Sequence, residues 1–426
     1  MQNVKGTFDY FGPEQAVRKQ VQTTLQEVFE LYDFDSLDST ILNELELLTS
    51  KYAGGDEILK EMYQLTDQGR RKLGLRYDLT IPFAKIIALN PGIELPFRRY
   101  EIGKVFRDGP VKRGRLREFL QCDADVVGIA GPEAEAELMQ LAVEVFGRLA
   151  VPVTLKWNNR RFLGELLEAI GVPADLKLTV MLTLDKIEKI GCANVRRELL
   201  DKGLPAEAAS ELITLVERDD PTFEAIAIQY GLRGAPGALE VIALQELIRT
   251  LGLDDICRFD PFLSRGLSFY TGTVYEIFDA TGVFASSLGG GGRYDDIIGQ
   301  LVGREDLRYP TVGLSFGMES IMELLGDRSR PAANPTAMII PIGDTVGEVL
   351  RAASALRSQG IRIRVDMSKR KLRKSLASAS SKGIRYVLLI GETEAAANNL
   401  LLKDMEEQTE TVVGIDEAVA LLKRER

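Results

Sequence analysis

The chain has 426 residues, of which 45% are hydrophobic and 27% charged, and its formal net charge is −10. This composition is typical of a globular protein, and the length suggests two to three domains. The chain contains no histidine, which excludes imidazole zinc ligands, Ser-His-Asp triads and a histidine general base. If the chain is an enzyme, it must catalyse its reaction by positioning the substrates and stabilising charge, or by using carboxylate side chains.

Elements of both kinds are expected in the first 150 residues. Residues 14–32 have helical spacing, with Pro13 at the first turn. A short strand at 34–37, a helix at 44–52 and a helix at 132–149 are also predicted. Between them, strand-like stretches at 61–65, 72–77, 97–106 and 118–128 form an apparent antiparallel set.

The rest of the chain divides at a polar segment. Residues 174–253 are mostly helical and are interpreted as an inserted subdomain, and strands resume at 271–278 and 311–315. A linker rich in turn-forming residues is predicted at 326–335. Beyond it, strands at 337–342, 362–365 and 386–390 alternate with helices at 346–358, 372–381 and 416–424. This alternation indicates a small, mostly parallel α/β domain at 336–426, after a first domain at 1–325.

The most basic segment is a loop between two strand-like stretches. It carries five cations: Arg107, Lys112, Arg113, Arg115 and Arg117. Guanidinium groups on such a loop can hold the phosphate oxygens of a polyanion. The alternative is a solvated hairpin tip, because basic clusters are commonly plain surface.

Two segments carry carboxylates at strand spacing. Asp78 and Thr80 would face one side of a strand and could hold an ammonium group, or they could form a turn that caps the following helix. Gln121, Asp123 and Asp125 would share one strand face, where burial is costly unless they meet a ligand. The alternative for the second set is a strand face exposed to solvent.

Three glycine-containing segments follow. Residues 264–272 place Arg265 near Tyr270, as in a pocket wall with an anion-binding arginine or in a hairpin with a packed tyrosine. Four glycines at 289–292 allow a backbone to approach a ligand closely, although the Lys-Ser/Thr of a P-loop is missing. Residues 313–319 run from a strand into a helix, where a nucleobase could rest on small side chains.

In this order the motifs resemble those of class II histidyl-tRNA synthetases, in a divergent second bacterial type, over nearly the whole chain. Arg265-Gly-Leu-Ser-Phe-Tyr270 and Gly291-Gly-Arg-Tyr-Asp295 are similar to the two signatures of the histidine enzymes. Segments 75–80 and 121–125 resemble the amino-acid pocket, and 106–119 resembles motif 2. The resemblance implies an α+β catalytic domain, with an antiparallel sheet and a helical insertion, followed by an α/β anticodon-binding domain.

The resemblance also implies an activity and its participants. A histidine–tRNA ligase activates L-histidine with ATP and Mg²⁺, releases pyrophosphate and transfers the histidyl group to tRNA-His. The first nucleophile is already an anion, so charge neutralisation and alignment suffice. The resemblance also implies a homodimer. We expect a cytoplasmic location without membrane contact, since the widely spaced Cys122, Cys192 and Cys257 fit reduced thiols and no apolar run could span a bilayer.

Site residues follow from the resemblance, motif by motif. The implied catalytic residues are Arg107, which holds the α-phosphate and the substrate carboxylate, and Arg265, which places a second cation on that phosphate. The implied substrate-binding residues are these two arginines with Asp78, Leu79, Thr80, Gln121, Asp125, Phe269, Tyr270 and Tyr294. For ATP they are Arg107, Arg115, Glu118 and Gly317, and for tRNA they are Lys112, Arg113, Lys369, Arg370, Arg373 and Lys374. No resident metal site is implied.

The chain departs from the family at four positions. Thr40 stands for the motif 1 proline, Leu116 for a tyrosine, and Gly109 for an acidic residue that reads adenine. Ser320 stands for the motif 3 arginine that grips the γ-phosphate. The last change favours an alternative function, that of a non-catalytic, synthetase-like regulatory subunit of ATP phosphoribosyltransferase. The intact Arg265 signature and the C-terminal domain favour the ligase.

Overall fold

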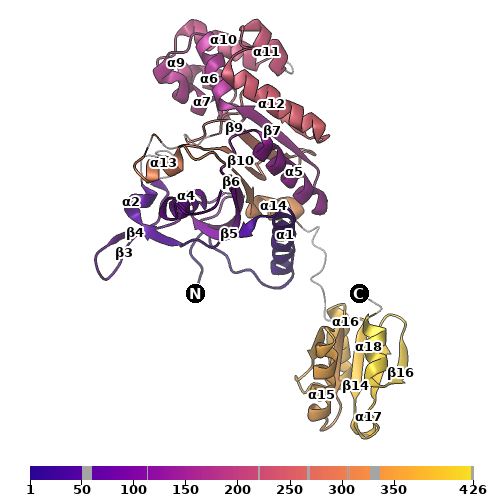
Figure 1. Cartoon of the computed structure of the whole chain (residues 1–426). Helices are drawn as coiled ribbons and strands as arrows, with labels where there is room; N and C mark the ends of the chain where they lie inside the picture. The colour runs from indigo at the N-terminus through magenta and orange to yellow at the C-terminus, as the bar shows by residue number, and fades with distance from the viewer. Residues whose placement is uncertain are drawn as a thin grey trace. The chain divides into compact units, whose positions relative to one another are not determined.

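The structure of the chain is a computed structural model that describes residues 1–49, 60–112, 114–218, 221–265, 269–304, 306, 308–326 and 336–423. It forms two compact units, Met1–Ser329 and Arg330–Arg426 (Figure 1). No helix among the described residues is both long and apolar enough to cross a membrane.

An eight-stranded sheet organises the first unit. Its order is β1 (Asp35–Ser36), β5 (Phe97–Phe106), β6 (Glu118–Val127), β11 (Thr311–Gly317), β10 (Gly289–Arg293), β9 (Thr273–Asp279), β7 (Val153–Asn159) and β8 (Cys257–Phe259). Only the edge pairs β1–β5 and β7–β8 are parallel. The predicted α+β architecture is therefore confirmed.

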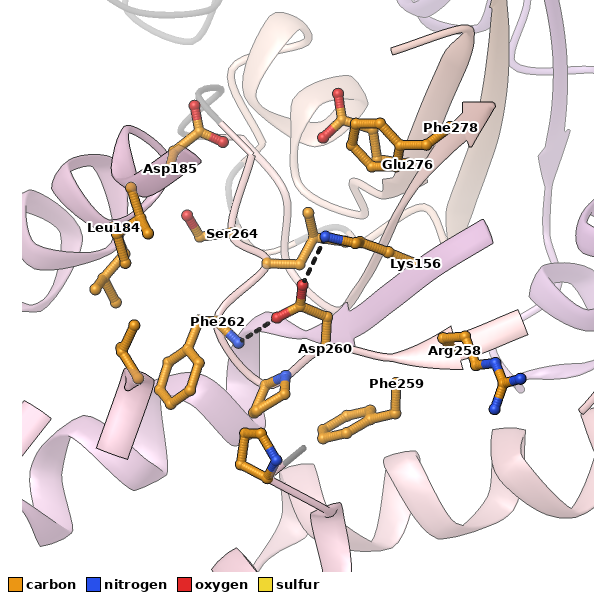
Figure 2. A pocket seen from close by; sticks show the side chains of 15 residues that line it. Lys156, Leu184, Asp185, Arg258, Phe259, Asp260, Phe262, Ser264, Glu276 and Phe278 are labelled. Atoms are coloured by element: carbon orange, nitrogen blue, oxygen red, sulfur yellow. Dashed lines mark hydrogen bonds and ion pairs between the residues drawn. The ribbon is translucent and has the colours of Figure 1, made fainter. Parts of the chain in front are cut away.

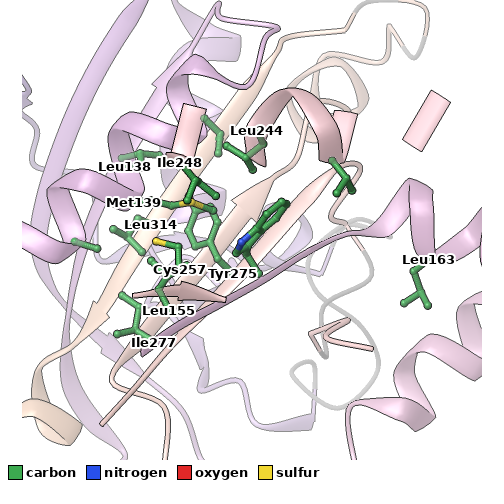
Figure 3. Packing of buried hydrophobic residues seen from close by; sticks show 14 of the residues in the cluster. Leu138, Met139, Leu155, Leu163, Leu244, Ile248, Cys257, Tyr275, Ile277 and Leu314 are labelled. Carbon is green, nitrogen blue, oxygen red and sulfur yellow. The ribbon is translucent and has the colours of Figure 1, made fainter. Parts of the chain in front are cut away.

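Helices bury one face of this sheet. The helices are α1 (Gly12–Leu31), α5 (Glu133–Arg148), α6 (Arg160–Ala169), α12 (Pro236–Thr250) and α14 (Met318–Leu325). Figure 3 shows Leu138 and Met139 of α5 and Leu244 of α12 packed over Ile277 and Leu314 of the sheet. Because side chains alternate along a strand, the neighbouring residues of these strands point to the opposite face. That second face carries the polar residues discussed below.

Smaller elements cover part of the second face. A three-stranded antiparallel sheet has the order β2 (Leu42–Glu44), β4 (Lys72–Leu75) and β3 (Gln64–Thr66), and α2 (Leu45–Leu48) follows β2. Helices α4 (Thr80–Leu89) and α13 (Ile297–Leu301) pack together beside it. The expectation that β3 and β4 share one antiparallel set with β5 and β6 is wrong, because β4 pairs with β2 on one side and with β3 on the other, in a separate sheet.

Between α6 and β8 the chain is helical. Its elements are η1 (Ala174–Leu176), α7 (Lys177–Leu184), α8 (Ile187–Ile190), α9 (Cys192–Asp201), α10 (Ala206–Val216), α11 (Phe223–Gln229) and α12. Their apolar faces join the main core cluster, so the segment packs as part of the first unit.

The second unit is a five-stranded sheet with helices. Its strand order is β13 (Ile363–Val365), β12 (Ala337–Pro341), β14 (Tyr386–Ile390), β15 (Leu400–Asp404) and β16 (Thr409–Val413). The first three strands are parallel and the last two are antiparallel additions. Its helices are α15 (Val346–Ser358), α16 (Leu372–Ser381), α17 (Glu392–Ala396) and α18 (Ile415–Lys423). The predicted mostly parallel α/β pattern is confirmed, although the sequence did not predict β15 and β16.

Candidate active site

The polar face of β6 is the centre of the candidate site. Gln121, Asp123 and Asp125 occupy alternate positions and lie opposite residues of β11, with Asp123 beside Ser315 in the register. Asp123 and Asp125 are each only 3% exposed. The prediction of one shared face is confirmed, and the solvent-exposed alternative is wrong for the two aspartates. Gln121 donates from Nε2 to the Ser315 hydroxyl over 3.0 Å.

Asp125 is held by two partners from distant parts of the chain. The Nη2 atom of Arg99 on β5 lies 2.7 Å from its Oδ2 atom, and the Tyr294 hydroxyl donates a short hydrogen bond to Oδ1. Burial raises the pKa of Asp125, and the Arg99 guanidinium opposes that rise. Gly313 lies opposite Asp125, and a Cβ atom there would overlap its carboxylate. Glycine is therefore required on the neighbouring strand.

Arg99 was missed by sequence reasoning. It is fully buried, and its guanidinium carbon lies 4.3 Å above the ring of Phe83. The available signal was the spacing of Arg99 and Glu101, two charged residues that share one face of β5. Glu101 is paired by Arg76, whose Nη1 atom lies 2.6 Å from Oε1. The site thus rests on a layer of buried ion pairs.

The segment with Asp78 is a turn and not a strand. Asp78 Oδ1 accepts a hydrogen bond of 3.1 Å from the backbone N–H of Ile81, in the first turn of α4. The capping alternative is thus confirmed, and the prediction that Asp78 and Thr80 share a strand face is wrong. Burial raises the pKa of Asp78 to about 6, against the opposing effects of these hydrogen bonds and of Arg107. Leu79 is buried beside it.

Arg107 follows β5 and lies close to this turn. Its Nε donates to the carbonyl oxygen of Tyr77 over 3.0 Å, and its guanidinium carbon lies 5.2 Å from the ring centroid of Phe119. Burial lowers the pKa of Arg107, while Asp78 raises it. The arginine is therefore fixed at the edge of the polar face, next to a carboxylate.

Two other predicted nucleotide-binding residues already have partners. Arg115 Nη2 lies 2.6 Å and 2.5 Å from the carboxylate oxygens of Glu61, a residue that sequence reasoning missed. Glu118 forms a short ion pair with Lys104. The Glu61 carboxylate also fills the space in which a side chain at Gly109 would lie. An acidic group is thus present there despite the departure at Gly109.

The glycine run forms the central strand β10 and carries Arg265 above it. A Cβ atom at Gly290 would overlap Nη1 of Arg265, so the guanidinium lies directly against the glycine backbone. Nη1 donates to the carbonyl oxygen of Tyr275 over 3.2 Å and lies 3.8 Å from Glu276 Oε1. Arg265 has a positive φ of 57°, a strained conformation for a residue other than glycine.

The aromatic residues next to Arg265 close this side of the site. The ring centroids of Phe269 and Tyr270 lie 4.7 Å apart, and those of Phe269 and Tyr294 lie 5.9 Å apart. The guanidinium carbon of Arg265 lies 5.9 Å from the Tyr270 ring. Residues 266–268 of the signature lie outside the described residues. The structure therefore brings Tyr270, Tyr294 and Arg265 to the same face as Asp125.

We expect the Gly290→Ala substitution to lower the free energy of unfolding by about 1–3 kcal/mol, because overpacking displaces neighbouring atoms. Its methyl group would lie 2.6 Å from the rigid carbonyl oxygen of Tyr275 as well as overlapping Arg265. Urea unfolding followed by Trp157 fluorescence measures the change, since Trp157 is the one tryptophan and lies buried in β7. Gly147→Ala in α5 is the control, because open space surrounds that position; equal effects of the two would contradict the prediction.

The end of β11 leads into α14. Gly317 is the last residue of the strand and the N-cap of the helix. Ser320 lies near the basic loop, with its Oγ atom 3.7 Å from the Cβ position of Gly114. Glu319 is paired by Arg18 of α1 through contacts of 2.7 Å and 2.8 Å. Arg18 therefore brings a positive charge to α14, but Glu319 neutralises that charge.

The predicted tRNA-binding residues are distributed over both units. Lys112 lies in the basic loop, where its backbone pairs with Arg115, while Arg113 lies outside the described residues. The remaining four surround the start of α16 and are all exposed: Lys369, Arg370, Arg373 and Lys374.

A cavity of about 340 Å³ extends the polar face beyond Arg265 (Figure 2). Ser264 and Glu276 line it next to Arg265, and Lys156 and Asp260 lie farther along, with their charged atoms 3.6 Å apart. Phe262 and Phe278 give it aromatic walls. None of the predicted site residues line this cavity, so it adds space next to the site.

Comparison with known proteins gives consistent matches. A family model described as Histidyl-tRNA synthetase matches residues 6–321, and one described as Anticodon binding domain matches residues 336–425. Histidine–tRNA ligase 1 of Bacillus cereus is 46% identical over 422 residues, covering 97% of each chain. Histidine–tRNA ligase 2 of Shouchella clausii is 46% identical over 418 residues, covering 95% of this chain and 96% of the relative.

The fold agrees with these matches. The crystal structure of histidyl-tRNA synthetase from Nostoc sp. PCC 7120 superposes with a TM-score of 0.84 at 27% sequence identity, covering 100% of this chain and 99% of that one. With nearly full-length relatives and a family model that spans most of the first unit, the chain belongs to the histidyl-tRNA synthetase family.

Proposed function

We propose that the chain is a histidine–tRNA ligase, which activates L-histidine with ATP to histidyl-adenylate and transfers the histidyl group to the 3′-end of tRNA-His. One observation carries this proposal: buried carboxylates and arginines meet on the same face of the sheet, where Asp125 lies against Gly313 and Arg265 lies against Gly290. Such a face can hold a ligand that carries both positive and negative groups. The relatives named as histidine–tRNA ligases support the same activity.

In this proposal the substrate imidazole is read by Asp125, Tyr270 and Tyr294. Asp125 accepts a hydrogen bond from Tyr294 and is paired with Arg99, so its orientation is set before the ligand binds. A ligand without a ring N–H would leave buried polar groups unpaired, which gives strong discrimination. Leu79 and Phe269 shape the pocket. Asp78, Thr80 and Gln121 hold the substrate ammonium group.

The activation step needs charge neutralisation and needs no protein base. The histidine carboxylate attacks the α-phosphorus of ATP, and pyrophosphate leaves with the electron pair of the broken P–O bond. Arg107 and Arg265 would hold the α-phosphate from two sides and stabilise the charge that develops on it. This chemistry suits a chain without histidine.

Arg115, Glu118 and Gly317 are the further residues that we propose for ATP. Arg115 would exchange its Glu61 partner for the distal phosphates, since both are anionic groups within reach of one guanidinium. Mg²⁺ would arrive bound mainly to the phosphates of ATP, where it neutralises charge.

We propose that tRNA contacts the basic loop, through Lys112 and Arg113, and the start of α16. The first turn of α16 has no acidic residue, and its N-cap is Lys371. Cations at a helix N-terminus oppose the helix dipole, so helix stability does not account for Lys369, Arg370, Arg373 and Lys374. Binding of RNA phosphates does account for them.

We also propose that the chain is a homodimer in the cytoplasm. Among the residues that the structure describes, large apolar side chains are exposed at the three-stranded sheet: Ile41 just before β2 (42% exposed), Leu42 in β2 (49%) and Leu65 in β3 (43%). Covering them in a symmetric interface would remove apolar surface from water. The cytoplasm is where an enzyme that charges tRNA would act.

The alternative function, a regulatory subunit of ATP phosphoribosyltransferase, is not favoured. Ser320 favours the regulatory function, because it stands where the family has a phosphate-binding arginine. Against it stand the match of residues 336–425 to an anticodon-binding domain and the naming of the 46% identical relatives as ligases.

The proposed function predicts histidine-dependent ATP–pyrophosphate exchange, followed by charging of tRNA-His. Both steps are measured with radiolabelled substrates on the full chain. We expect exchange with L-histidine and none with the other amino acids, because Asp125 and the tyrosines match the imidazole alone. A folded protein that shows no exchange at saturating histidine and ATP would rule out the ligase and leave the regulatory function.

A further inference from the structure

Asp123 is a buried carboxylate that has no part in the substrate contacts proposed above. It lies between Gln121 and Asp125 on the polar face of β6 and is only 3% exposed. Its Oδ1 atom has no hydrogen-bond partner among the described residues. An unpartnered buried carboxylate oxygen costs free energy, so its presence indicates a ligand group that comes to it.

The arginines near Asp123 form their ion pairs with other carboxylates. Arg99 Nη2 lies 2.7 Å from Asp125, and Arg76 Nη1 lies 2.6 Å from Glu101. Glu101 is the residue opposite Asp123 on β5. Of the three carboxylates on this part of the sheet, Asp123 is therefore the one whose charge is least compensated.

The sheet register places Arg265 across from Asp123. Asp123 pairs with Ser315 on β11, and Ser315 pairs with Gly290 on β10, against which the Arg265 guanidinium lies. Neighbouring strands are about 4.8 Å apart, so two strand spacings, roughly 10 Å, separate an anion from a cation. The small side chains between them leave room for a zwitterion with its ammonium toward Asp123 and its carboxylate toward Arg265.

Asp78, the other carboxylate proposed for the ammonium, is less available. Its Oδ1 atom already accepts the backbone N–H of Ile81, and Arg107 lies nearby. A carboxylate that is neutralised locally has a weaker attraction for a second cation. Asp123 keeps a free oxygen atom, and the part of the chain that the structure describes gives it no ion pair of its own.

We propose that Asp123 is a substrate-binding residue, the main anionic partner of the α-ammonium group of the amino acid. The proposal rests on the proposed function and adds to it a residue that neither the motifs nor the comparisons assign. Asp123 also selects ligands that carry an ammonium group, because a ligand without one would leave this carboxylate buried and uncompensated.

The protonation state of Asp123 makes this role measurable as a proton released on binding. Burial raises the pKa of Asp123 to about 8 in the free protein, and Asp125 adds to the rise while Arg99 opposes it. An arriving ammonium group stabilises the ionised form, so binding at pH 7 should release a proton from Asp123. Substitution of Asp123 leaves the other titratable and charged groups around it in place. These groups are Asp78, Arg99, Glu101, Asp125, Arg265, Tyr270 and Tyr294.

The test is calorimetry with Asp123→Asn, which keeps the shape of the side chain. The ligands are L-histidine and its hydroxy-acid analogue, in which a hydroxyl replaces the ammonium group. We expect the variant to bind histidine about 10- to 100-fold more weakly, the range for a hydrogen bond to a charged group. Its affinity for the analogue should change less than threefold. Titrations in two buffers of different ionisation enthalpy should show about one proton fewer released by the variant.

A matched control is Asp260→Asn, the same change on the cavity beyond Arg265, where the carboxylate is paired with Lys156 over 3.6 Å. It should leave histidine affinity within about twofold. Equal weakening of both ligands by Asp123→Asn, or unchanged affinity and proton release, would overturn the inference and leave the ligase intact. If the wild-type chain binds no histidine, the proposed function itself fails, and the inference fails with it.

Discussion

The Arg265→Ala variant should lose about 10²- to 10³-fold or more in histidine-dependent pyrophosphate exchange, the range for removing one preorganised charge-stabilising group. The guanidinium lies against Gly290, is only 20% exposed and donates to the carbonyl oxygen of Tyr275, so its position is set before the substrates bind. Calorimetry should find that histidine still binds, with its dissociation constant raised by less than about tenfold, because the imidazole and ammonium contacts remain and Arg107 still holds the substrate carboxylate.

The control for this variant is Arg258→Ala. Arg258 is an exposed residue of β8 that lines the neighbouring cavity on the same side of the sheet, where Figure 2 shows it beyond Phe259. Its removal deletes one positive charge from the same unit, and exchange should stay within about twofold. If Arg265→Ala weakens histidine binding as much as it slows exchange, Arg265 holds the ground-state substrate and has no special role at the α-phosphate.

The Arg99→Met variant should lose about 3–5 kcal/mol of the free energy of unfolding, since breaking a buried ion pair leaves the other charge uncompensated. Arg99 is fully buried, 2.7 Å from Asp125 and 3.9 Å from Glu101. Urea unfolding followed by Trp157 fluorescence reports the change in the first unit. Arg161→Met is the control, because that arginine is 53% exposed and pairs with Glu240 at the surface, where a pair contributes under about 1 kcal/mol.

The loss in Arg99→Met should also depend on pH. Arg99 lowers the pKa of both Asp123 and Asp125, whose burial raises them. Without Arg99 their pKa values in the folded state rise further, and a carboxylate with a raised pKa destabilises the fold as the pH rises. The difference between variant and wild type should therefore be larger at pH 8 than at pH 5.5. A loss that is equal at both pH values would mean that packing, and not charge, makes Arg99 important.

Much of the fold follows from local sequence patterns. The long strands β5 and β6 match the predicted 97–106 and 118–128, and α1 begins around Pro13 as the first-turn proline indicates. One strand that was missed, β10, had no such pattern. β10 is a run of four glycines and one arginine, and its strand conformation comes from pairing with β9 and β11 on both sides. Glycine has weak strand propensity, so only the neighbouring strands could specify it.

The candidate site was predicted in part. Alternation along β6 predicted that Gln121, Asp123 and Asp125 share a face, and they do. The same argument failed for Asp78, because its carboxylate bonds to the backbone of the next helix and forms a turn. Arg99 and Glu61 were not found, since their importance depends on which carboxylate or guanidinium lies opposite them in space.

The sequence by itself therefore determined the family, the α+β class and the exclusion of imidazole chemistry, because these depend on motif order, periodicity and composition. Only the tertiary structure decided which charges compensate one another. Asp125 is paired by Arg99 and bonded by Tyr294, 169 residues away, whereas Asp123, two positions earlier on the same strand, keeps a free oxygen. That difference comes from strand register and packing between distant segments, and it is the basis for assigning Asp123 to the substrate.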